Sequence, residues 1–145
     1  MIVESIEIAR RPEDVFAYLD QLDRHGEWQE QIIDTKLPQE GPTQVGTRAI
    51  DTRNVPGGPR EITYEVTEHD PPRMTAFRGI DGPVRVVGKA TVEPVGDGGH
   101  SRVTIELDFK GHGFGKLVAP MARRQARKQV PKDQLSLKER LESAA

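Results

Sequence analysis

The cysteines and histidines define which metal or nucleophilic chemistry this sequence can support. The chain has no cysteine, which excludes thiolate nucleophiles, disulfides and cysteine-ligated metals. None of its four histidines, His25, His69, His100 and His112, belongs to a His-Glu-x-x-His metal motif. We therefore expect no metal and no cofactor. His25, His69 and His100 lie in polar or turn segments, and we expect them to face solvent.

Acid–base or oxyanion chemistry has three weak candidates, which are Tyr64, His112 and Arg124. Tyr64 alternates with Ile62 and Val66, so its hydroxyl is expected to point into a cavity or to need a buried partner. A structural role and a ligand contact both remain open for it. His112 precedes a predicted helix, where a neutral imidazole at a cavity rim can act as a general base. The serines lack a nucleophile-elbow context, and most carboxylates alternate with apolar residues toward water.

The segment Gly111-His112-Gly113-Phe114-Gly115 follows a predicted strand and opens a predicted helix, as a phosphate-binding loop does. Its glycine spacing is Gly-x-Gly-x-Gly, however, and no parallel βαβ unit surrounds it. We expect these glycines to provide backbone freedom for a sharp strand-to-helix turn instead of a nucleotide site.

The elements that would position these residues follow from a change of hydrophobic period near Gly111. Residues alternate as strands from Arg60 to Lys110, and a helical period begins at Phe114 and runs almost to the C-terminus. A first strand is expected at Ile2–Ala9, followed by a helix that begins at Pro12 and a second short helix at Asp20–Trp28. Six further strands are expected at Gln31–Leu37, Gly46–Asn54, Glu61–Glu68, Met74–Ile80, Val84–Glu93 and Ser101–Lys110. This order predicts an antiparallel sheet closed by one long helix.

Several segments resemble the SRPBCC superfamily, which contains START lipid-transfer domains, birch-pollen-allergen relatives and polyketide cyclase/dehydrase-like proteins. The matching segments are Arg11–Asp20 followed by Trp28, Tyr64–Glu68 with Pro71-Pro72-Arg73, and Gly88–Pro94 with Ser101–Phe109. The resemblance implies one START-like ligand-binding domain over residues 1–145 with the α+β helix-grip fold. In that fold a curved seven-stranded antiparallel sheet wraps around a long C-terminal helix, with two short helices after the first strand. The resemblance also implies a deep apolar cavity between sheet and helix.

Aromatic and helical residues are the candidates for lining such a cavity. The candidate ligand-binding residues are Trp28, Tyr64, Phe77, Phe109, Leu117, Met121, Arg124 and Lys128. For Trp28 a core position and a position at the cavity mouth both remain open. For Phe77 and Phe109, core and cavity lining remain open, and either Phe77 or Arg78 can be the inward residue of its strand.

The long helix is expected to turn one face to the cavity. At about 100° per residue, Leu117 and Met121 share a face to which Arg124 and Lys128 return. A fully buried unpaired charge is too costly, so these two cations are expected to pair with acids of the sheet rim or with an anionic ligand group. The helical period places Lys116, Arg123 and Arg127 toward solvent. Pro131 is expected to end or kink the helix near Val130.

The net charge of −2 is distributed unevenly along the chain. Six of the 21 basic residues and no acid lie between His112 and Lys132, which leaves 15 basic against 23 acidic residues elsewhere. A basic helix that complements an acidic body and a basic helix that meets an anionic ligand, lipid headgroup or partner both remain open. The stripe has no interleaved aromatics and the chain is acidic, so no nucleic acid is expected.

The N-terminus lacks the layout of a signal peptide, and no apolar stretch approaches the ~20 residues of a membrane span. We therefore expect a cytoplasmic monomer or homodimer without a transmembrane segment.

The leading functional hypothesis is binding of a small hydrophobic molecule that is lipid-, polyketide- or aromatic-like, and a ligand with an anionic end remains open. The resemblance implies a second hypothesis, a polyketide cyclase or dehydratase that uses Tyr64, His112 or Arg124. A third hypothesis is an interaction module that docks through its basic C-terminal helix. A carrier requires a closed apolar cavity without a convergent acid–base pair, whereas an enzyme requires such a pair.

Overall fold

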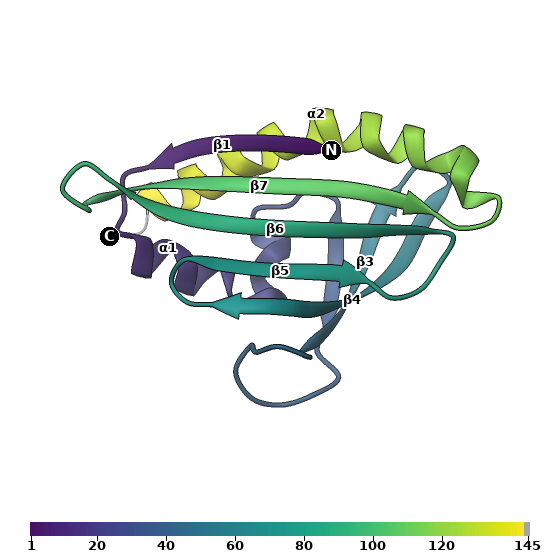
Figure 1. Cartoon of the computed structure of the whole chain (residues 1–145), viewed down its shortest axis with the longest axis horizontal. Coiled ribbons are helices and arrows are strands. Elements are labelled where there is room, and N and C mark those ends of the chain that lie inside the picture. The colour runs from purple at the N-terminus through teal and green to yellow at the C-terminus, as the bar shows by residue number, and fades with distance from the viewer. Residues whose placement is uncertain (144–145) are drawn as a thin grey trace.

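A computed structural model describes residues 1–143 as a curved antiparallel sheet with helices on one face (Figure 1). The seven strands have the order β1-β7-β6-β5-β4-β3-β2. The elements are β1 (Ile2–Ile8), α1 (Pro12–Leu19), η1 (Leu22–Glu27), β2 (Ile32–Lys36), β3 (Arg48–Val55), β4 (Gly58–Asp70), β5 (Met74–Gly79), β6 (Val84–Val95), β7 (His100–Gly111) and α2 (Gly115–Ser143). The predicted helix-grip fold is thereby confirmed, although the last two residues of the expected 1–145 domain lie outside the described part.

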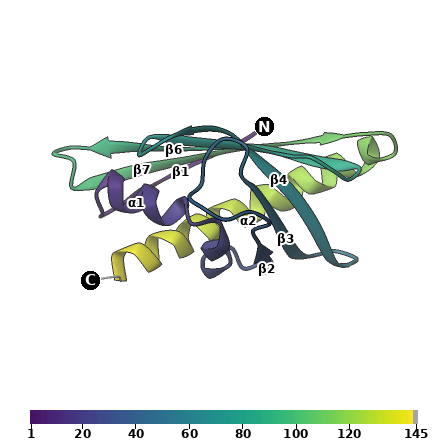
Figure 2. The same cartoon turned by 90° about the horizontal axis from the view of Figure 1, so that it is seen from below.

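The sheet curves around α2. Figure 2 shows β1, β6 and β7 as one layer with α2 beneath them, while β3 and β4 bend down beside the helix. Paired residues of neighbouring strands share a face, so Ile6, Val103 and Val92 form one row on the concave side. The main core lies under this row and contains Ile8, Val15, Phe16, Leu19, Trp28, Val92, Val103, Leu137 and Leu141.

The two short helices close one end of the concave face. Pro12 occupies the first turn of α1, and Glu13 and Asp14 lie at the positive end of its dipole. Val15, Phe16 and Leu19 are the buried side of this helix. The second segment, η1, is a 3₁₀ helix that buries Leu22 and ends at Trp28.

The glycines between β7 and α2 permit a close approach to the β5–β6 turn. Gly113 has a positive φ of 62°, and a Cβ at Gly115 would overlap the carbonyl oxygen of Pro83. The His112 backbone N–H donates to that same oxygen at 2.7 Å. The expected role of this segment as a sharp turn is therefore confirmed, and His112 itself is exposed.

Helix α2 continues through Pro120 and Pro131, so of the two predicted effects of Pro131, an end or a kink near Val130, the end is wrong. Pro131 lacks a backbone N–H, but buried residues lie on both sides of it in the helix. The buried residues of α2 are Gly115, Ala119, Gln129, Val130, Asp133, Gln134, Leu137 and Leu141, which follow one continuous face.

The predicted register of the first half of α2 is also wrong. Leu117 and Met121 are 81% and 68% exposed, and Arg124 and Lys128 on the same face are exposed without an ion pair within residues 1–143. The face that packs on the sheet carries small residues, which allow the helix axis to approach closely.

Arg123, expected in solvent, is instead turned to the sheet. Pairing between β1 and β7 begins at Ile2 and Leu107, so β7 has an open edge beyond Leu107. Arg123 covers that edge, with Nε donating to Asp108 Oδ1 at 3.0 Å and Nη2 donating to the Phe109 carbonyl at 2.6 Å. Lys116 and Arg127 face solvent as expected.

Candidate functional site

An ion pair between a buried carboxylate and a partly exposed guanidinium lies on the concave face at β3. Asp51 is only 3% exposed and accepts a hydrogen bond from Thr35 Oγ1 at 2.9 Å. Arg53 lies two residues along the same face, with Nη2 3.7 Å from Asp51 Oδ2. Arg53 also donates to Gln29. Burial raises the pKa of Asp51, while Arg53 and the Thr35 bond oppose that rise. Asp51 and Arg53 therefore form an ion pair inside the curve of the sheet, and each of them also has a hydrogen bond to a neighbouring side chain.

His25 approaches this pair from η1. Its Nε2 lies 2.6 Å from the Leu19 carbonyl oxygen. A carbonyl can only accept, so Nε2 carries the proton and Nδ1 is the proton-accepting nitrogen of the neutral ring. Burial lowers the pKa of His25, and Asp51 and Arg53 act on it electrostatically in opposite directions. The imidazole is therefore neutral near pH 7, the state that a general base needs.

Tyr64 supplies a buried hydroxyl without a partner. It is 6% exposed, its ring centroid lies 5.3 Å from that of Phe77, and its hydroxyl forms no hydrogen bond with any described residue. Burial, followed by the charge of Asp51, raises its pKa, so the hydroxyl remains a donor. Trp28 Nε1 is likewise buried without a partner among residues 1–143. Buried donors are normally paired, so an acceptor from outside the chain is expected at each of them.

Helix α2 contributes polar side chains to the interior. Gln129 donates to Asp133 Oδ1 at 2.8 Å and to Glu30 Oε1 at 3.0 Å. Burial raises the pKa of Asp133, while its bond to Gln129 and the charge of Arg53 oppose that rise. Strand β3 and α2 thus each carry a buried carboxylate that acts electrostatically with Arg53.

An apolar surface, here called the apolar floor, continues from Tyr64 across the concave face. Its members face inward but remain partly exposed, and they are Ile62, Phe77, Val86, Leu107 and Phe109. Gly88 makes room for it, because a Cβ there would lie 2.5 Å from Phe77 Cζ and 2.7 Å from Leu107 Cδ2. Partly exposed apolar side chains on an inward face leave room for an apolar ligand.

Two surface depressions lie away from the apolar floor. One of about 560 Å³ is lined by Glu27, Ser136, Glu139, Arg140 and Ser143. The other, of about 240 Å³, is lined by Tyr18, Arg24, Glu27, Arg140 and Leu141. Both are formed by α1, η1 and α2 side chains, so neither is the expected deep cavity between sheet and helix.

The structure separates the sequence-based candidates into two groups. Trp28, Tyr64, Phe77 and Phe109 lie on the interior side. The exposed group consists of His112, Leu117, Met121, Arg124 and Lys128. The inward residue of β5 is Phe77, which pairs with Gly88 and packs on Tyr64, whereas Arg78 is exposed and pairs with Glu65.

The prediction that His25 and His69 face solvent is wrong. His25 packs edge-on against Trp28, with ring centroids 5.3 Å apart. His69 has a side chain only 12% exposed and bonds Asp20 Oδ1 at 2.9 Å. Both errors arise because α1 and η1 fold back over the concave face and cover polar segments that look solvated in the sequence. His100 is exposed as expected.

Asp51 and Arg53 were missed as site residues. The alternation of a strand could have identified them, because residues two apart share one strand face. Asp51 and Arg53 are therefore on the same face as Ala49. Ala49 is fully buried, which places the two charges on the inward side with it.

The comparisons with known proteins agree with this arrangement. Residues 2–142 match the family described as "Polyketide cyclase / dehydrase and lipid transport", so the chain belongs to that family and to the SRPBCC superfamily. A comparison with curated proteins found no match.

Solved structures support the same fold at low sequence identity. The Zhui aromatase/cyclase from Streptomyces has a TM-score of 0.84 at 15% identity, covering 97% of this chain and 92% of that one. A protein from Thermus thermophilus has a TM-score of 0.81 at 18% identity, covering 99% and 98%. A START superfamily protein from Mycobacterium smegmatis has a TM-score of 0.80 at 13% identity, covering 99% and 98%.

Two searches among the described residues bear on other kinds of site. Residues 1–143 hold no cluster of three or more His, Asp or Glu side chains suited to a metal ion. Within the same range, no helix has the length and apolar character needed to span a membrane.

Proposed function

We propose that this protein is an acid–base enzyme of the cyclase or dehydratase type that acts on a small hydrophobic, oxygen-bearing substrate. The observation that carries the proposal is buried Asp51, paired with the partly exposed Arg53, which acts electrostatically on neutral His25 and on the partnerless Tyr64 hydroxyl. An enzyme needs such convergence of titratable groups, whereas a carrier does not.

The electrostatic influence of Asp51 on His25 and Tyr64 supports one elimination in which each residue has a role. The apolar body of the substrate lies on the apolar floor, and its carbonyl oxygen accepts a hydrogen bond from Tyr64. Nδ1 of His25 removes a proton from the carbon next to that carbonyl, and electron density moves onto the oxygen held by Tyr64. The imidazolium then returns the proton to a β-hydroxyl group. The C–O bond breaks, a C=C bond forms, water leaves and His25 is neutral again.

Asp51 and Arg53 influence the charges that develop in this reaction. The carboxylate lies near enough to His25 to stabilise the transient imidazolium electrostatically, and Arg53 limits how far Asp51 itself takes up a proton. Family membership and the likeness to a structure described as an aromatase/cyclase support the same class of reaction.

The test uses aromatic β-hydroxy ketones as probes and follows enone formation by absorbance. We expect His25→Gln, which keeps a donor for the Leu19 carbonyl but cannot take a proton, to lower kcat by about 10²-fold or more. Tyr64→Phe should lower kcat by about 10²–10³-fold through loss of oxyanion stabilisation. His112→Ala is the matched control and should be unchanged, because His112 is exposed. Equal turnover by wild type, His25→Gln and Tyr64→Phe would rule out the enzyme.

A carrier is the second candidate, and the partly exposed apolar floor favours it. Native mass spectrometry of protein purified from its own host would identify a retained small molecule. Phe77→Ser should weaken its retention while His25→Gln leaves it bound. A retained ligand that is released chemically unchanged, together with no turnover of the probes, would favour the carrier over the enzyme.

A further inference from the structure

An apolar cluster stands exposed on the first half of α2 and on Phe114, the residue directly before it. We propose that this cluster, with the cations around it, docks the protein on the surface of an anionic lipid bilayer. The docking face consists of Phe114, Leu117, Val118 and Met121, which are 76%, 81%, 44% and 68% exposed. They recur at intervals of three and four residues and so form one stripe on the helix. Clustered exposure of large apolar side chains marks an interaction surface, whereas single exposed residues do not.

The docking face cannot turn inward by rotation of the helix. The opposite side of α2 is anchored by Gly115 against Pro83 and by Arg123 on Asp108 and the Phe109 carbonyl. Further along, Val130 and Leu137 are buried on the same anchored side. The exposed stripe is therefore the outward face of a fixed helix.

Unpaired cations surround the docking face. Lys116, Arg124 and Lys128 are exposed, and within residues 1–143 the side chain of none of them forms a hydrogen bond or an ion pair. The sequence from Phe109 to Lys132 contains no acid that could neutralise them. Charge complementarity therefore points to an anionic surface as the occupant.

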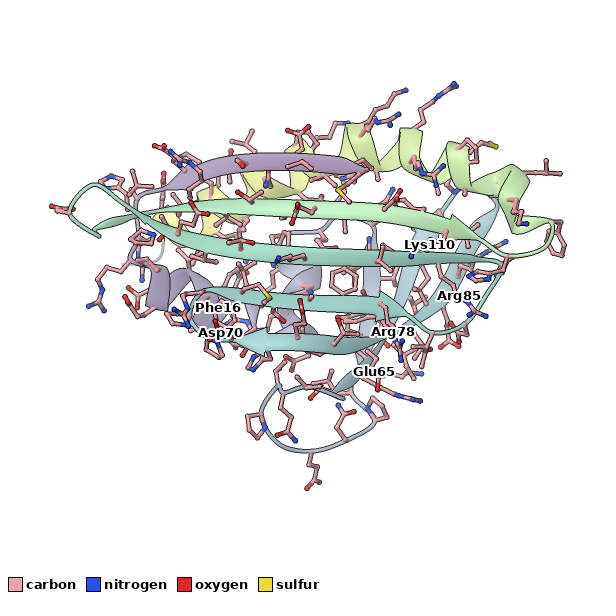
Figure 3. The ribbon with its side chains drawn as sticks, in the orientation of Figure 1. Phe16, Glu65, Asp70, Arg78, Arg85 and Lys110 are labelled. Atoms are coloured by element: carbon pink, nitrogen blue, oxygen red, sulfur yellow. The ribbon has the colours of Figure 1, made fainter. Side chains whose placement is uncertain are left out.

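The end of the sheet beside the start of α2 carries two more cations. Arg85 and Lys110 are direct cross-strand partners on β6 and β7, and Figure 3 shows both at the end where α2 begins. They alternate with the inward-facing Val86 and Phe109, so they lie on the convex face of the sheet, whereas α2 packs on the concave face. The docking face is therefore confined to α2 and the turn before it.

The shape of the surface favours a bilayer over an acidic protein. Leu117 and Met121 are 81% and 68% exposed, so these apolar side chains extend into solvent. Protruding apolar groups flanked by Lys and Arg are the pattern of helices that insert one face into the headgroup region of anionic membranes.

Flotation of the full chain with phosphatidylcholine vesicles, with and without phosphatidylglycerol, tests the proposal. We expect binding only to the vesicles that contain phosphatidylglycerol, and weaker binding as salt increases. Arg124→Glu with Lys128→Glu should weaken that binding by about 25-fold or more, because each cation near an anionic bilayer contributes roughly five-fold. Leu117→Ser with Met121→Ser should weaken it by about ten-fold or more per side chain while leaving the charge unchanged.

Val45→Ser is the matched control. Val45 is 61% exposed and belongs to the loop between β2 and β3, on the side of the molecule opposite α2 in Figure 1. We expect this variant to float as wild type does, and circular dichroism should show all variants folded, since every substituted side chain is exposed. The proposal is overturned if wild type ignores both vesicle types, binds both equally, or loses binding as much with Val45→Ser as with the α2 variants. The first of these outcomes would leave an acidic protein as the partner.

Discussion

Burial, together with the charge of nearby Asp51, raises the pKa of Tyr64, yet the Tyr64 hydroxyl donates no hydrogen bond to Asp51 or to any other described residue. A hydroxyl that is desolvated without a partner opposes folding. A buried, unpaired Tyr64 hydroxyl is consistent with the proposed contact to substrate. Its effect on the free energy of unfolding can be measured.

Tyr64→Phe should leave the free energy of unfolding unchanged or raise it by about 1–3 kcal/mol, because the variant removes an unsatisfied buried group and keeps the ring. Urea unfolding of wild type and variant provides the measurement. The matched control is Tyr18→Phe, which removes a hydrogen bond of 2.7 Å to Glu27 and should lower stability by about 1 kcal/mol. A marked destabilisation by Tyr64→Phe would mean that its hydroxyl has a partner in the folded protein.

The pH dependence of stability should report the burial of His25. Burial lowers its pKa, so between its folded pKa and the ordinary value of about 6.5 the unfolded chain binds a proton that the folded protein does not. Stability is therefore fully present above about pH 6.5 and decreases as pH falls through that window, by at most about 1.4 kcal/mol per pH unit. Urea titrations at a series of pH values measure the slope.

The His25→Gln variant isolates this contribution. Burial raises the pKa of Asp51, which makes folding more favourable as pH falls and so acts in the opposite direction. Because Asp51 is present in both proteins, the difference between their slopes belongs to His25 and to its coupling with Asp51. The variant should show a flatter decrease below about pH 6.5. Parallel curves for the two proteins would contradict the buried, neutral imidazole.

The close backbone contact between Gly115 and Pro83 predicts that a side chain at position 115 lowers stability. Gly115→Ala would place a methyl group on the Pro83 carbonyl oxygen, so the turn must shift and stability should fall by about 1–3 kcal/mol or more. Gly26→Ala is the control, since its new methyl group would lie 3.4 Å from Ile32 Cγ2 in ordinary contact. Thermal unfolding of the two variants compares them. Equal melting temperatures would show that α2 does not begin where the structure places it.

The parts of the fold that depend on local pattern could be predicted from the sequence. The side chains of β6 and β7 alternate with a period of two, which is set within each strand. Pro56 and Gly57 are typical turn residues, and they join β3 to β4. Strands β4 and β6 extend beyond their alternating segments, because a paired neighbour continues the ladder where the pattern is weak.

The register of α2 and the polar interior could not be predicted in the same way. Apolar size points to Leu117 and Met121 as the buried face, but close packing on a sheet selects Gly115 and Ala119 instead. Which face packs depends on the distance between helix and sheet, and the periodicity of the sequence carries no information about that distance. Likewise, the sequence around His25 is polar, and only the packing of η1 against β2 brings His25 under the electrostatic influence of Asp51.

Arg123 and Arg124 provide a direct test of that register, because they are adjacent in the sequence and differ in contacts. Arg123→Ala removes the ion pair with Asp108 and the bond to the Phe109 carbonyl, and it exposes the edge of β7 beyond its pairing with β1. We expect a loss of about 1 kcal/mol, since the pair is only partly buried. Arg124→Ala should change stability by less than about 0.5 kcal/mol, as for other exposed positions. Urea unfolding of both variants decides between the two registers: a larger loss at Arg124 would restore the face on which Leu117 and Met121 point inward.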